Sequence, residues 1–123
     1  MKQGPEIRIG TVSTVDYRNG MVSVKYNDLS GSVTADMPML SMNGEYSMPK
    51  IDDTVLVVYL SNGSSIGIVL GPFWNETNRP PLTGKDVFYK RLAEDAYIKY
   101  KNGELVVKAP TLKIITDNET KVI

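Results

Sequence analysis

The sequence predicts an all-β protein, and three observations support this fold class. Apolar and polar residues alternate in short segments rich in β-branched side chains, beginning at Ile7. Turn signals such as Asn62-Gly63 and Asn102-Gly103 separate these segments. Almost no stretch has the 3.6-residue periodicity of an amphipathic helix. The 123 residues suffice for one core and an extension.

The first two predicted elements form a hairpin. A strand over Ile7–Asp16 is followed by the turn Arg18-Asn19-Gly20 and a second strand over Met21–Asn27. In the second strand Val22, Val24 and Tyr26 share one face, whereas Ser23 and Lys25 share the other. The alternation therefore predicts a sheet with one buried face.

A third strand is predicted over Ser32–Met37, and a long loop follows from Pro38 to Asp53. Asn43-Gly44 and Pro49 disfavour a regular element in the loop. Four of the six methionines gather in this region, which favours filling the open end of a barrel over forming a contact surface; they are Met37, Met39, Met42 and Met48.

The fourth and fifth strands are predicted over Thr54–Ser61 and Ser65–Gly71, joined by Asn62-Gly63. Their continuous apolar runs predict strands that are covered on both faces. Five strands with a long excursion between the third and the fourth are the layout of an OB-fold, a small Greek-key barrel. We assign residues 1–74 to this five-stranded barrel.

Residues 75–84 are predicted to form an extended connector, because Pro80, Pro81 and Gly84 lie among polar turn residues. Phe73 and Trp74 stand where the barrel ends. Large aromatic residues at this position either anchor one subunit to another or cap their own barrel.

Residues 85–123 contain four short predicted strands, over Asp86–Leu92, Ala96–Lys101, Glu104–Ala109 and Leu112–Thr116. Alternation collects apolar residues on one side, with Lys99, Lys108 and Lys113 among the residues on the other. The apolar set comprises Ile98, Tyr100, Leu105, Val107, Leu112 and Ile114. Roughly 40 residues without disulfides or metals rarely form a stable monomeric core, which favours oligomerisation. Packing of these strands onto the barrel as a second sheet is the alternative.

Composition excludes several functional classes. The chain has no Cys and no His, which removes thiolate nucleophiles and the usual general base and metal ligands, so we expect no catalytic, metal or cofactor site. Asp52 and Asp53 are neighbours in an extended segment and point apart, so we interpret them as turn-capping residues. Residues 1–8 contain no apolar run, and we expect no export signal.

Three segments resemble the baseplate assembly protein V, or central spike, family of contractile phage tails and related injection machines. The resemblance spans residues 7–74 and rests on Ile9-Gly10-Thr11-Val12 followed by Val22-Ser23-Val24-Lys25-Tyr26, on Tyr46-Ser47-Met48-Pro49-Lys50-Ile51-Asp52-Asp53-Thr54-Val55-Leu56-Val57, and on Gly67-Ile68-Val69-Leu70-Gly71-Pro72-Phe73-Trp74. The second and third motifs are the more specific ones. Members of the family usually have Gly where this chain has Asp52.

The resemblance implies a non-enzymatic homotrimer. Its OB-folds would form a collar against the tail tube or hub protein, and residues 85–123 would intertwine as a triple-stranded β-helix with the apolar set at the trimer core. A separate tip protein at the C-terminal end and the target cell envelope are the other implied partners. The resemblance also implies synthesis in the bacterial cytoplasm and a mature place in a tail baseplate. The iron site at the tip of some family spikes is not expected without His.

An OB-fold adaptor that binds single-stranded nucleic acid or protein is the alternative function. Residues 1–83 carry six basic and eight acidic side chains. This net negative charge disfavours a phosphate-binding groove, so we expect no specific nucleic acid partner.

Overall fold

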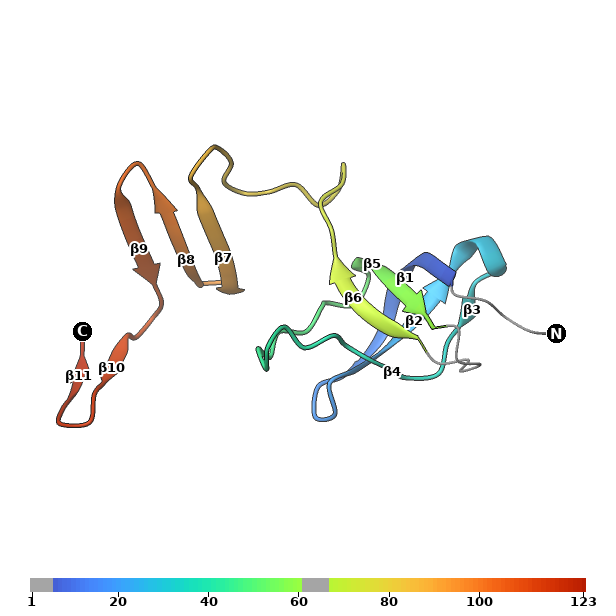
Figure 1. The fold of residues 1–123 in the computed structure, drawn as a ribbon, viewed down its shortest axis with the longest axis horizontal. Coiled ribbons are helices and arrows are strands. Elements are labelled where there is room, and N and C mark those ends of the chain that lie inside the picture. Colours follow the sequence, from blue (N-terminus) through green and yellow to red (C-terminus); the bar gives the residue numbers. More distant parts are fainter. Residues whose placement is uncertain (1–5, 61–66) are drawn as a thin grey trace. The chain divides into compact units, whose positions relative to one another are not determined.

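The computed structural model describes residues 6–60 and 67–123, and the chain divides into two compact units. Unit 1 is Met1–Asn78 and unit 2 is Arg79–Ile123. The division falls inside the range 75–84 that the sequence assigned to a connector. Both units consist of antiparallel strands, so the all-β prediction is confirmed (Figure 1).

Unit 1 is built on a central sheet in the order β3-β2-β1-β5-β6 (Figure 1). Strand β1 (Glu6–Asp16) pairs with β2 (Met21–Tyr26) on one side and with β5 (Thr54–Tyr59) on the other, and β5 pairs with β6 (Ile68–Pro72). The predicted hairpin of β1 and β2 is confirmed. The predicted Asn62-Gly63 turn lies outside the described residues.

The predicted third strand over Ser32–Met37 is wrong as a continuous element. The structure has two strands of two residues each, β3 (Ser32–Val33) and β4 (Met37–Pro38), and both pair with β2. Between them the hydroxyl of Thr34 accepts a hydrogen bond from the Val24 backbone N–H at 3.0 Å. A side chain therefore takes the place of a ladder carbonyl. A short 3₁₀ helix, η1 (Asn27–Leu29), precedes β3.

Residues after β4 reach the opposite edge of the sheet. Met39 forms a parallel bridge with Val69 of β6, and the Leu40 backbone N–H donates to the Val69 carbonyl at 2.8 Å. The Met39 N–H also donates to the Gly20 carbonyl at 2.9 Å. This segment thus links the β2 side of the sheet to β6.

The core of unit 1 lies on one face of the curved sheet and is dominated by valine. Its buried members are Val12, Val22, Val24, Tyr26, Met37, Val55, Val57 and Val69. Met39 and Met48 pack against this core, whereas Met42 is 66% exposed. Core filling is therefore confirmed for three of the four methionines that the sequence singled out. Gly10 is required on this face because a Cβ there would collide with Val24 and lie 2.8 Å from the Tyr26 ring.

The prediction that β5 and β6 are covered on both faces is wrong for this chain alone. Val55, Val57 and Val69 are fully buried, but Leu56, Val58 and Ile68 on the opposite face are only partly covered, and Leu70 is 41% exposed. Side chains alternate between the two faces of a sheet, and no described residue of unit 1 covers the second face fully.

Unit 2 contains a three-stranded antiparallel sheet in the order β7-β8-β9, with strands that lie side by side (Figure 1). They are β7 (Phe88–Ala93), β8 (Ala96–Lys101) and β9 (Glu104–Lys108). A separate hairpin joins β10 (Lys113–Ile115) to β11 (Thr120–Val122), a strand that the sequence analysis did not identify. The Thr116 hydroxyl accepts a hydrogen bond from the Glu119 N–H at 3.1 Å within the hairpin turn.

Candidate functional site

The strongest candidate in unit 2 is an apolar face of the β7–β8–β9 sheet. Residues directly opposite each other in an antiparallel pair share a face. One row joins Phe88, Tyr100 and Leu105, and the next joins Lys90, Ile98 and Val107. We call this surface the Leu105 face. This face brings together the four residues of β8 and β9 that sequence alternation had placed on one apolar side, namely Ile98, Tyr100, Leu105 and Val107. It also contains Phe88 of β7.

The Leu105 face is open in a single chain. Leu105 is 66% exposed, Phe88 is 54% exposed and Val107 is 44% exposed. Throughout unit 2, every residue of which is described, Ala96 alone is buried. A sheet with apolar side chains and no core of its own gains little from the hydrophobic effect unless another surface covers it.

The terminal hairpin distributes its apolar residues differently from the prediction. Ile114 lies opposite Lys121, whereas Lys113 shares its face with Val122 and Ile115. Ile114 and Lys113 therefore do face opposite sides, but the Lys113 side is not purely polar. Leu112 is partly covered and precedes β10, and its carbonyl accepts a hydrogen bond from the Ile123 N–H at 2.9 Å.

Phe73 and Trp74 follow β6 and are exposed, with Trp74 62% accessible. The Phe73 carbonyl accepts a hydrogen bond from the Asn78 side-chain amide at 3.0 Å. The Asn75 side-chain oxygen in turn accepts hydrogen bonds from the backbone N–H groups of Thr77 and Asn78 at 2.9 and 2.8 Å. A local turn thus fixes the backbone here, while the Trp74 side chain is largely exposed. Their role as anchors between subunits stays a prediction.

Unit 1 carries an exposed apolar surface on the sheet face opposite its core. Ile7 pairs with Val58, which pairs with Ile68, and Ile9 pairs with Leu56. Ile7 and Ile9 are 69% and 57% exposed. We call this surface the Ile7 face. Sequence reasoning missed it because continuous apolar runs in β5 and β6 were interpreted as two buried faces rather than as one core and one open face.

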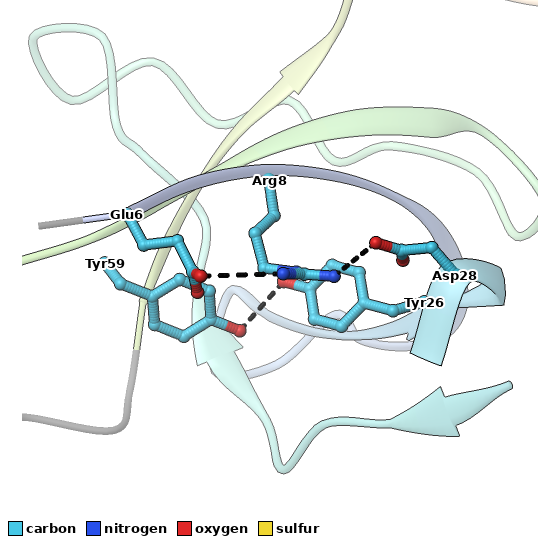
Figure 2. Close-up of polar contacts among 5 residues, drawn as sticks. All are labelled: Glu6, Arg8, Tyr26, Asp28 and Tyr59. Atoms are coloured by element: carbon cyan, nitrogen blue, oxygen red, sulfur yellow. Dashed lines mark hydrogen bonds and ion pairs between the residues drawn. The ribbon is translucent and has the colours of Figure 1, made fainter. Parts of the chain in front are cut away.

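A polar cluster connects β1, β2, η1 and β5 in unit 1 (Figure 2). The guanidinium of Arg8 lies 4.7 Å from the centroid of the Tyr26 ring and donates a hydrogen bond to Asp28 at 2.6 Å. A second nitrogen forms an ion pair with Glu6 at 3.6 Å, and the hydroxyl groups of Tyr26 and Tyr59 are hydrogen-bonded at 2.8 Å. The Arg8 Nε atom is buried without a partner in the described part of the chain.

The pKa shifts in this polar cluster, which we call the Arg8 cluster, indicate a structural role. Burial and the hydrogen bond to Tyr59 raise the pKa of Tyr26, which keeps its hydroxyl neutral. Burial lowers the pKa of Arg8, but the hydrogen bond and charge of Asp28, together with the charge of Glu6, outweigh burial and raise it. A charged residue at an inward-facing position, two before Gly10, is the sequence signal that could have revealed this cluster.

Asp52 and Asp53 lie at a turn and not in the extended segment that the sequence predicted, because Asp52 has a left-handed backbone with φ of 76°. The Asp53 carboxylate accepts a hydrogen bond from the Lys50 N–H at 2.8 Å, which confirms its capping role. Among the described residues, no three acidic side chains gather closely enough to hold a metal ion. The described helices include none with the length and apolar character needed to span a membrane.

Comparison with protein-family models and with curated proteins found no match for this chain.

Proposed function

We propose that this chain is the trimeric central spike of a contractile tail or injection machine, acting mechanically rather than as an enzyme. The observation that carries the proposal is the Leu105 face: exposed apolar residues on a three-stranded sheet that has no core in one chain. Three chains wound around a common axis would bury this face and join the open edges of β7 and β9.

Unit 1 fits an OB-fold collar in this proposal. The support is the strand order β3-β2-β1-β5-β6, together with the link from Met39 and Leu40 to Val69 that connects the two sides of the sheet. The Ile7 face is the surface offered to a tube or hub protein, and Phe73 and Trp74 are the proposed anchors between subunits.

A triple-stranded β-helix would suit axial load. Its strands would be hydrogen-bonded between chains, so force would be shared along the ladder instead of being borne by one edge. The spike would plug a tail tube, move outward on sheath contraction and press into the target envelope. A separate tip protein would meet its C-terminal end.

The mass of the full chain in solution tests this proposal. We expect light scattering at micromolar concentration to give three times the chain mass of 13.6 kDa. A monomer or dimer would contradict the spike.

A protein-binding adaptor is the second candidate function, and the exposed Ile7 face favours it. An adaptor of this kind is compatible with a monomer, so the same mass measurement separates the two functions. Unit 1 carries five basic and eight acidic side chains, which disfavours the nucleic-acid form of this candidate.

A further inference from the structure

The second face of the β7–β8–β9 sheet is rich in tyrosine and positive charge. One row joins Tyr89, Lys99 and Val106, and the next joins Arg91, Tyr97 and Lys108. We call this surface the Tyr97 face. Unit 2 as a whole has nine basic and six acidic side chains, a positive balance opposite to that of unit 1. The cations on this face are therefore part of a wider charge asymmetry.

Two ammonium groups lie near the Tyr97 ring. Lys99 Nζ lies 5.6 Å and Lys108 Nζ 5.9 Å from the centroid of the Tyr97 ring. The Tyr89 ring packs against the same ring, with centroids 5.8 Å apart and an interplanar angle of 24°. The negative face of an aromatic ring attracts cations, so the Tyr97 ring attracts both lysines.

The charge of these two lysines is not neutralised within unit 2. Arg91 on the same face forms an ion pair with Glu94 at 2.8 Å. Neither Lys99 nor Lys108 forms an ion pair with a carboxylate anywhere in this fully described unit. Lys99 also lines a hollow of about 260 Å³ together with Leu82, Lys101, Asn102 and Glu104. An anion can therefore approach Lys99 from solvent.

We propose that Lys99 and Lys108 form a binding site for phosphate groups, and that its ligand is a flexible soluble chain of phosphate groups without aromatic bases, such as polyphosphate. An ammonium group is a compact point charge that suits phosphate oxygens. Tyr97 already packs against Tyr89 and lies under two ammonium groups, so it does not offer the bare ring on which a nucleic-acid base stacks. The site lies within unit 2 of one chain, and its two lysines are on the face opposite the Leu105 face.

Titration of the full chain with inorganic polyphosphate tests the site. At about 50 mM salt we expect binding by calorimetry, and raising the salt to about 200 mM weakens a contact of two charges about tenfold. The double variant Lys99→Gln/Lys108→Gln loses about tenfold in affinity at the lower salt. The matched control Lys113→Gln/Lys121→Gln removes the same charge from the terminal hairpin and changes affinity by less than about threefold.

Each other outcome overturns the proposal. Absence of polyphosphate binding at about 50 mM salt removes the site. Equal losses in the two double variants, both confirmed as folded by circular dichroism, show net charge attraction without a site. Binding to phosphatidylglycerol vesicles but not to polyphosphate assigns the phosphate to a lipid headgroup. Tighter binding of a single-stranded oligonucleotide than of polyphosphate of equal charge shows that bases contribute.

Discussion

Individual residues stabilise two turns of unit 1 in different ways. Asp16 accepts hydrogen bonds from both the backbone and the side chain of Asn19, at 3.2 and 2.9 Å, and so closes the turn between β1 and β2. Asp52 instead adopts a left-handed backbone with φ of 76°, a conformation that favours glycine. The first turn is held by the Asp16 side chain. The second turn has a non-glycine residue in a strained backbone conformation next to the Asp53 cap.

Replacing Asp52 by glycine should stabilise the protein. The exposed Asp52 side chain pays the steric cost of a left-handed conformation, while its backbone N–H keeps the 2.9 Å hydrogen bond to the Val12 carbonyl in either variant. We expect Asp52→Gly to raise the free energy of unfolding by about 0.5 to 1 kcal/mol. Asp53→Ala, which removes the cap on Lys50, should lower it by about 1 kcal/mol. Chemical denaturation measures both, and a destabilised Asp52→Gly would contradict the assignment of strain.

The hydrogen bonds from Asn19 lower the pKa of Asp16. A lowered pKa in the folded state contributes stability that is present above the unfolded pKa of about 3.9 and is lost as the pH falls through the folded value. Asn19→Ala removes the side-chain donor, so the pKa of Asp16 should rise toward its ordinary value. An NMR titration of the Asp16 carboxyl carbon measures this. The control Asn27→Ala replaces another exposed asparagine of unit 1 and should leave the pKa of Asp16 unchanged. If Asn19→Ala also leaves this pKa unchanged, the side-chain hydrogen bond does not lower it.

At the scale of elements, the sequence predicted strands best where alternation and turn residues agree. The β1–β2 hairpin and the strands β8 and β9 satisfy both signals. The segment Ser32–Met37 was predicted as one strand. In the structure the Thr34 hydroxyl accepts the hydrogen bond from the Val24 N–H, and the ladder is interrupted between β3 and β4. The three-residue strand β11 is too short to show alternation. The Arg8 cluster joins residues from four separate elements, a proximity that periodicity along one strand cannot express.

The two faces of the β7–β8–β9 sheet allow a direct comparison by the same substitution. Leu105 lies on the Leu105 face, and Lys101, in the neighbouring strand, lies on the opposite face beside Glu104. In a trimer, Leu105→Asn should remove burial worth about 1.5 to 3 kcal/mol per side chain and lower the melting temperature or dissociate the assembly. Lys101→Asn should change stability by less than about 0.5 kcal/mol. Thermal melts with light scattering compare them, and equal stability of the two variants would show that the Leu105 face is not an interface.

At the scale of the whole molecule, the two units differ in how they obtain stability. Unit 1 has a valine core of its own and the Arg8 cluster. In unit 2, Ala96 is the only buried residue. Hydrophobic burial is the main favourable contribution to folding, so we expect unit 1 to fold within one chain and unit 2 to require contacts beyond its own residues. The spike proposal supplies those contacts from two further copies of unit 2.

This dependence predicts that the melting temperature of unit 2 increases with protein concentration. Dissociation and unfolding of a trimer releases three chains, so a tenfold rise in concentration adds about 2.7 kcal/mol to the stability of the assembly. The entropy of unfolding scales with chain length. We therefore expect a shift of about 10 °C per tenfold dilution if unit 2 melts alone, and about 3 to 4 °C if the whole trimer melts in one step. Circular dichroism melts over two decades of concentration measure the shift. A melting temperature independent of concentration would mean that unit 2 is stable within a single chain, and the trimeric spike would then lose its physical basis.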